Sequence, residues 1–218
     1  MPLPLIPVIV GIVLLFAGGT AAIVIPKLAK KLAGKRVAIL GGQKVGKTTL
    51  LHILRDGRVP KRASHTVDPA LGGRFVMEVG GKEIDFDVPN DLPGHHNFGL
   101  SHWEAAFAGA DYVWYLFRSD LIAQGDPSEI RKVKDHLDLF KDWMGSGVST
   151  LPKVILIGTW ADQAPGYTED FAKFIGDIGG NFPIKHGAIK LNNADLVVGS
   201  LVTNKDSKVL IKSLRSYL

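Results

Sequence analysis

The residues with the clearest chemical meaning are a cluster of glycines, lysines and threonines near the start of the chain. They are Gly41, Gly42, Gln43, Lys44, Val45, Gly46, Lys47, Thr48 and Thr49. The glycines let backbone N–H groups converge on phosphate oxygens, Lys47 can neutralise the β and γ phosphates, and Thr48 offers a hydroxyl to Mg²⁺. Such a loop needs a strand before it and a helix after it, and the sequence predicts a strand over 36–40 and a helix over 48–55. This context favours a nucleotide phosphate site over the alternative, a glycine-rich turn with a solvated lysine.

A second group of candidate residues, Asp91-Leu92-Pro93-Gly94-His95, follows a predicted strand over 83–88. A nucleotide site needs a carboxylate for its metal ion and a glycine amide for the γ phosphate at this place. The alternative is an ordinary Pro-Gly turn after a strand. We therefore assign this segment to the same site as the phosphate loop.

Together, the two motifs resemble the G domain of Ras-like GTPases. The form Asp-x-Pro-Gly-His is similar to that of translational GTPases and of the signal-recognition-particle receptor beta subunit. The chain as a whole also resembles the Arf-like group. The resemblance covers residues 36–218. It implies that Asp91 holds Mg²⁺ through water, Gly94 senses the γ phosphate and His95 positions the attacking water.

The resemblance also implies a threonine ligand for Mg²⁺ in the loop between the two motifs. Thr66 lies eighteen residues after Thr48, within a polar stretch from Asp56 to Gly73 that is rich in turn-forming residues. Ser64 competes for this role, and a solvated loop threonine is an equally good interpretation.

We assign recognition of the nucleotide base to the segment Thr159-Trp160-Ala161-Asp162, which follows a predicted strand over 154–157. Asp162 would accept hydrogen bonds from the ring N–H and the exocyclic amine of guanine, which adenine does not present in that arrangement. G domains have Asn-Lys-x-Asp here. Threonine replaces only part of the bonding of asparagine, and Trp160 can stack on the base in place of the lysine stem. A last loop with Ser200 and Leu201 would contact the guanine edge through its backbone.

Composition limits the other function classes. The chain has 218 residues and no cysteine, which excludes disulfides and thiolate metal sites and agrees with a reducing compartment. Of its 26 basic residues, eight precede the first acidic residue, Asp56. The chain from Asp56 onward therefore has 18 basic and 21 acidic residues, a net charge of about −3. This balance argues against nucleic acid as a partner. His96, His102 and His136 have no metal-ligand spacing and are interpreted as ordinary surface or helix residues.

The first residues predict a membrane anchor. Leu3 to Ile25 is a run of 23 uncharged residues, which as a helix would span about 35 Å. The basic residues Lys27, Lys30, Lys31, Lys35 and Arg36 follow it and none precedes it, so the positive-inside rule places the N-terminus outside and the body in the cytoplasm. We predict a transmembrane helix over 1–26, a basic linker over 27–35 that can touch lipid head groups, and a GTP-binding domain over 36–218. The membrane would be the inner membrane in a bacterium and the endoplasmic reticulum in a eukaryote. A cleaved signal peptide and a buried core helix are the alternatives.

The helices and strands that must position these residues are predicted to form an α/β fold. Short β-rich runs alternate with helical patterns, which predicts a mostly parallel six-stranded sheet flanked by helices. The remaining strands are expected over 74–79, 112–117 and 196–198, with Gly80 and Gly81 forming a hairpin turn. A helix is expected after its cap Asp126, with Glu129 completing a capping box, and a final helix begins near Asp206.

Two function hypotheses follow from the sequence. The first is a membrane-anchored small GTPase that binds GTP and Mg²⁺, hydrolyses GTP slowly, and switches a protein effector bound on the loops around Thr66 and His95. The second is a membrane scaffold that holds nucleotide without a useful hydrolytic cycle, which the unusual Thr159 and Trp160 pair motivates. An ATP-driven motor or transporter subunit is a weaker third possibility.

Overall fold

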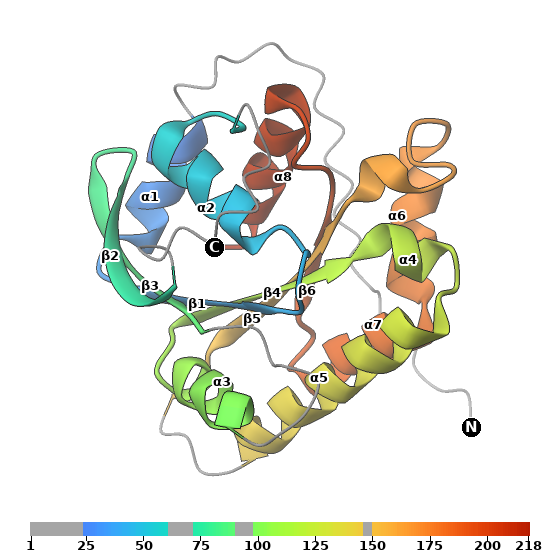
Figure 1. Cartoon of the computed structure of the whole chain (residues 1–218), viewed down its shortest axis with the longest axis horizontal. Helices are drawn as coiled ribbons and strands as arrows, with labels where there is room; N and C mark the ends of the chain where they lie inside the picture. Colours follow the sequence, from blue (N-terminus) through green and yellow to red (C-terminus); the bar gives the residue numbers. More distant parts are fainter. Residues whose placement is uncertain (1–23, 61–71, 90–97, 146–149) are drawn as a thin grey trace, which may run out of the picture.

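A six-stranded sheet forms the centre of the molecule (Figure 1). The computed structural model describes residues 24–60, 72–89, 98–145 and 150–218. The strands are β1 (Arg36–Gly41), β2 (Gly73–Val79), β3 (Lys82–Val88), β4 (Tyr112–Arg118), β5 (Lys153–Thr159) and β6 (Asp195–Val198). Their order is β2-β3-β1-β4-β5-β6, and only β2 runs antiparallel to its neighbour. The predicted α/β fold and all six predicted strands are confirmed.

The central strands are buried on both faces, which explains their continuous apolar sequence. In β5, Ile155 and Ile157 join one hydrophobic cluster, whereas Val154 and Leu156 join the other. Side chains of a strand alternate between the two faces of a sheet, so one apolar run supplies both clusters. The predicted hairpin turn is also confirmed: β2 pairs with β3, and both glycines between them have positive φ angles.

Helices cover both faces of the sheet (Figure 1). One face carries α1 (Val24–Leu32), α2 (Lys47–Asp56) and α8 (Asn204–Ser216). The other carries α3 (Phe98–Ala108), α4 (Ser119–Ala123), α5 (Pro127–Gly145), α6 (Phe171–Gly180) and α7 (Phe182–Lys190). A short 3₁₀ turn, η3 (Ala161–Gln163), follows β5. The helix predicted after the phosphate loop and the final helix are both present.

The helix α1 packs on the domain, although the sequence analysis placed most of it in a linker. Its residues Ile25, Leu28, Ala29 and Leu32 are buried in the cluster that also contains α2 and α8. This spacing puts all four on one side of a helix, and the lysines on the other side are exposed. The folded unit therefore includes at least residues 24–35 in addition to the predicted domain.

The predicted membrane span lies almost entirely outside the described residues, which begin at Val24. Within the described part of the chain, no helix has both the length and the apolar character needed to cross a membrane.

The helix α5 begins as predicted, but one of its expected contacts is different. The Asp126 side chain accepts from the backbone N–H of Glu129 at 2.8 Å, which confirms the cap. Glu129 does not complete the capping box: its carboxylate is 2% exposed and accepts from the backbone N–H of Arg118 and from Lys132. The end of β4 and a lysine on the next helical turn therefore take the place of the capping contact.

The histidine in the middle of α5 is a core residue rather than a surface one. His136 is buried, and its Nδ1 lies 2.9 Å from the Tyr115 hydroxyl. Burial lowers the pKa of His136 to about 4. It is therefore neutral near pH 7 and serves packing.

Candidate functional site

The candidate site lies at the carboxyl ends of β1, β5 and β6. The loops that follow parallel strands meet at this end of the sheet, which is the usual ligand position in such folds. A cavity of about 270 Å³ opens there. Six of the predicted nucleotide-binding residues line it: Gly46, Thr49, Thr159, Trp160, Asp162 and Leu201. Segments far apart in the sequence therefore converge on one cavity.

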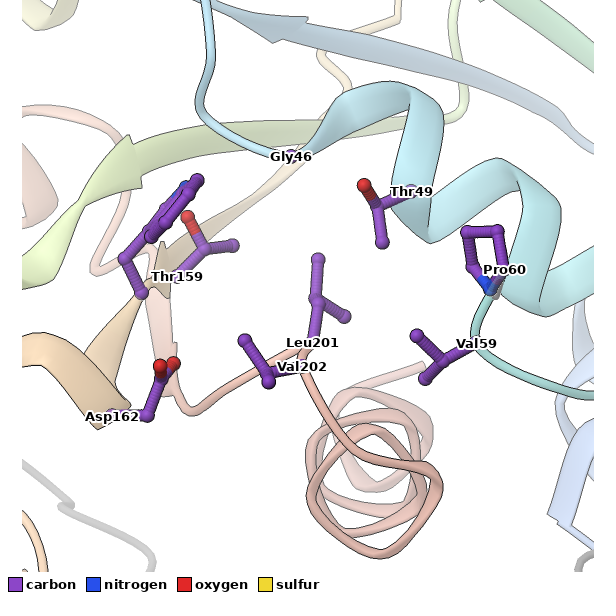
Figure 2. Close-up of a pocket in the computed structure, with 9 residues that line it drawn as sticks. Gly46, Thr49, Val59, Pro60, Thr159, Asp162, Leu201 and Val202 are labelled. Carbon is purple, nitrogen blue, oxygen red and sulfur yellow. The ribbon is translucent and has the colours of Figure 1, made fainter. Parts of the chain in front are cut away.

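Figure 2 shows how the lining side chains are arranged. Thr159 and Asp162 lie on one side of the cavity and Thr49 lies on the other, with Leu201 between them. Val59, Pro60 and Val202 complete the lining, and the sequence analysis did not identify them. They come from the segment after α2 and from the residue next to Leu201, so proximity to the predicted loops was the only available signal.

The phosphate loop has the backbone and the charge that anion binding requires. Gly41 and Gly46 have φ angles of 145° and 93°, so the chain turns sharply between β1 and α2. The first turn of α2 contains no acidic residue, and its backbone N–H groups favour an anion at this helix end. The Lys47 ammonium donates to the carbonyl oxygens of Gly41 and Gly42, at 2.6 and 2.9 Å. The loop therefore binds the side chain of its own Lys47 through its backbone carbonyl groups, next to exposed Thr48.

Thr159 fixes the phosphate loop to the end of β5. Its hydroxyl donates to the carbonyl oxygens of Val45 and Phe117, at 2.8 and 3.1 Å, and the residue is 1% exposed. The Ser119 hydroxyl in turn donates to the Thr159 carbonyl at 2.6 Å. The threonine thus links the loop to two strands, in addition to lining the cavity.

Trp160 is held from two directions. Its indole N–H donates to the carbonyl oxygen of Lys44 in the phosphate loop at 2.9 Å. The Arg118 guanidinium lies 4.4 Å from the centre of the ring, a cation–π contact, and Asp120 fixes that guanidinium through a 2.7 Å hydrogen bond. The ring therefore has a defined position beside the cavity. The sequence analysis assigned Arg118 no role, because this stacking depends on a tertiary contact.

Asp162 presents an acceptor to the cavity. Its Oδ2 accepts from Gln163 Nε2 at 2.6 Å. Its Oδ1 is buried and has no hydrogen-bond partner among the residues that the structure describes. A buried carboxylate oxygen is costly without a donor, so this atom is suited to a ligand that supplies N–H groups.

The loop after β6 lines the cavity beside η3. The Gly199 carbonyl accepts from the backbone N–H of Ala161 at 3.3 Å, which joins this loop to η3. Ser200 is fully buried and its hydroxyl accepts from Val202 N at 3.1 Å, so its side chain serves the loop itself. Leu201 packs close to the start of α2, since a Cβ on Gly46 would lie 3.1 Å from its Cδ1.

The remaining predicted site residues, Thr66, Asp91, Gly94 and His95, lie outside the described ranges. Of the predicted metal ligands, only Thr48 is described. No cluster of three or more His, Cys, Asp or Glu side chains that could hold a metal ion occurs within the described ranges. The roles of these four residues stay predictions.

Comparison with known proteins gives likeness in structure only. No family profile and no curated protein sequence matches the chain. A mutation variant of SsGBP matches with a TM-score of 0.53 and 14% identity, over 84% of this chain and 55% of that one. A GTP-binding protein from the hyperthermophilic archaeon Sulfolobus solfataricus, in complex with GDP, matches with a TM-score of 0.52 and 14% identity, over 86% and 51%. The complex of SsGBP with GDP matches with a TM-score of 0.52 and 13% identity, over 84% and 48%.

This chain spans about half the length of those structures. At such low identity the likeness concerns the fold and does not extend to the ligand. The chain shares the α/β fold of these structures, with its six-stranded, mostly parallel sheet.

Proposed function

We propose that this chain is a membrane-anchored GTPase that binds GTP with Mg²⁺, hydrolyses it slowly and acts as a switch for a protein partner. The main support for nucleotide binding is the cavity itself, which joins the end of the phosphate loop to the buried Oδ1 of Asp162, an atom that has no hydrogen-bond partner in the described part of the chain. One end of this site suits a phosphate chain and the other suits a base that carries N–H donors. Proteins of the same fold have been solved with GDP.

The preference for guanine over adenine is proposed from the acceptor character of Asp162. The guanine edge carries a ring N–H and an amine on adjacent atoms, and a carboxylate can accept from both. Fluorescent GDP bound to the chain should therefore be displaced by GTP and not by ATP at the same concentration. Equal displacement by both nucleotides would contradict the proposal.

Asp162→Asn is expected to weaken GDP binding by at least about tenfold, because hydrogen bonds to a charged acceptor contribute about 1.5–3 kcal/mol. In addition, the asparagine NH₂ group would lie against an N–H group of guanine, so two donors would meet. The same amide can donate to the carbonyl that xanthine carries in place of the guanine amine, so binding of xanthosine diphosphate should improve. Isothermal titration calorimetry with GDP and with xanthosine diphosphate measures both changes in affinity.

The matched control for that variant is Asp177→Asn, which changes an exposed carboxylate on α6 that pairs with Lys173. Its affinities for both nucleotides should equal those of the wild type. If Asp162→Asn also keeps the wild-type affinities, Asp162 does not contact the base.

Hydrolysis is proposed to depend on His95, with Thr48, Thr66 and Asp91 holding Mg²⁺ and Gly94 near the γ phosphate. His95→Ala should leave GTP affinity unchanged and lower single-turnover hydrolysis by roughly 10²-fold, a typical effect of losing a group that assists proton transfer. Phosphate release measured over hours tests this. An unchanged rate removes His95 from the mechanism, and wild-type chain that retains GTP unhydrolysed for days favours the scaffold hypothesis.

Membrane attachment is proposed for the uncharged residues 3–23 that precede α1, with the folded body on the cytoplasmic side. The exposed lysines of α1, Lys27, Lys30 and Lys31, follow this run directly. Native chain should therefore stay in the membrane pellet after extraction with alkaline carbonate, whereas a variant lacking residues 3–23 should be released. Release of the native chain would contradict the anchor and leave the nucleotide site unaffected.

A further inference from the structure

We infer that this site recognises a purine base at one edge: Asp162 contacts the N1 and N2 side, and N7 receives no hydrogen bond from the described side chains that line the cavity. A guanine nucleotide and its 7-deaza analogue should then bind equally well. Guanine has acceptors at N7 and O6 and donors at N1 and N2, so full recognition needs protein donors as well as an acceptor. The inference rests on the proposed function and specifies the chemistry of its base site.

Thr159 has no proton left for N7. A threonine hydroxyl carries a single O–H donor. That donor points to the carbonyl oxygens of Val45 and Phe117, at 2.8 and 3.1 Å. Redirecting it to a base would take this donor away from the Val45 carbonyl in the phosphate loop, at a cost of about 1–3 kcal/mol. An asparagine amide has two N–H donors and could serve the loop and the base together, but a threonine cannot.

The other polar side chains that line the cavity are Trp160, Asp162 and Thr49. The indole N–H of Trp160 is already bound to the Lys44 carbonyl. Asp162 contributes only an acceptor when it is ionised. Thr49 lies across the cavity from Thr159 and Asp162 (Figure 2), on the side of Val59 and Pro60. Among the described side chains that line the cavity, Thr49 is thus the single hydroxyl that could compete for N7.

A base can be oriented in this cavity without a hydrogen bond to N7. Arg118 lies over the Trp160 ring, and the N–H edge of that ring is tied to the phosphate loop. The rest of the ring borders the cavity. Stacking of a base on an aromatic ring contributes roughly 1–3 kcal/mol and does not depend on the atoms at the base edge. Stacking on Trp160 and pairing with Asp162 together define the plane and the direction of the base.

The experiment is a competition assay with the full chain and fluorescent GDP. Unlabelled 7-deaza-GDP should displace the probe with an affinity within about twofold of that of GDP, because N7 makes no bond to lose. Inosine diphosphate, which lacks the exocyclic amine, should bind at least about fivefold more weakly, because Asp162 loses one donor. Binding of 7-deaza-GDP that is tenfold or more weaker than that of GDP would overturn the inference. A failure of GDP itself to displace the probe would instead count against the proposed function.

Two variants of Thr159 sharpen the assay. Thr159→Asn adds an amide donor and should create a preference of about fivefold or more for GDP over 7-deaza-GDP. Thr159→Ser keeps the single hydroxyl and should retain the wild-type ratio near one. If the wild type prefers GDP and Thr49→Val removes that preference, Thr49 donates to N7 and the inference is wrong. The wild-type ratio decides the question even if the asparagine variant does not fold.

Discussion

Replacing Lys47 by alanine is expected to abolish measurable nucleotide binding. The ammonium of Lys47 lies 2.6 and 2.9 Å from the carbonyl oxygens of Gly41 and Gly42, so it is already held at the mouth of the phosphate loop. Each charge-assisted hydrogen bond from such a group to a phosphate contributes about 1.5–3 kcal/mol. Loss of two such bonds lowers affinity by roughly 10²-fold or more. Calorimetric titration with GDP and Mg²⁺ measures this directly.

A lysine on the surface of α5 provides the control. Lys141 is exposed, and within the described part of the chain its ion pair is with Asp142, which is exposed as well. Lys141→Ala removes the same charge from the chain, so its GDP affinity should stay within about twofold of the wild type, since exposed pairs contribute about 0–1 kcal/mol. Circular dichroism spectra of both variants establish that they are folded. A Lys47→Ala variant that is folded and binds GDP like the wild type would contradict the assignment of residues 41–48 to phosphate.

The strands could be predicted because their signals are local. In a sheet covered on both faces, strands such as β4 and β5 are uninterrupted apolar runs, and the glycine pair after β2 fixes a tight turn. The phosphate loop and the Thr159–Asp162 segment were found for the same reason, since each is one short stretch at the end of a strand. Contiguous motifs can be read from a single sequence.

Two helices gave weaker signals because their stability comes from packing. α6 contains Gly176, Gly179 and Gly180, which disfavour a helix in isolation. α7 packs against α5 at Gly187, where a Cβ would lie 2.3 Å from the Leu137 side chain. The apolar spacing of α1 was present in the sequence, but it begins at the end of a longer uncharged run that predicts a membrane span. For α6 and α7, tertiary contacts decide, and these contacts have no local pattern in the sequence.

The base side of the candidate site shows the same limit. Sequence analysis treated Thr159 as a partial replacement for an asparagine that contacts the base, whereas the structure directs its hydroxyl to Val45 and Phe117. Arg118 comes from the end of β4 and reaches Trp160 across the sheet edge. The identity of the residues at the site could be predicted in large part, but the direction of their hydrogen bonds could not.

Gly41→Ala is expected to destabilise the fold by at least about 3 kcal/mol. A Cβ at this position would lie 2.4 Å from the carbonyl oxygen of Leu116, a backbone atom of the neighbouring strand. Gly41 and Leu116 are partners in the parallel pairing of β1 with β4, so that carbonyl cannot retreat without breaking the sheet. The φ angle of 145° adds strain for any residue with a side chain, about 1–3 kcal/mol. Urea unfolding followed by circular dichroism measures the free energy of unfolding.

The adjacent glycine separates this backbone effect from a general need for glycine in the loop. A Cβ on Gly42 would meet only the Lys132 side chain, at 3.4 Å, and no positive φ angle is required there. Lys132 is flexible and partly exposed, so it can move aside, and Gly42→Ala should change the free energy of unfolding by less than about 1 kcal/mol. Equal destabilisation by the two variants would mean that the contact between β1 and β4 is not what fixes the start of the phosphate loop. A large difference would place the constraint in the sheet, because the same methyl group is then tolerated one residue further along the loop.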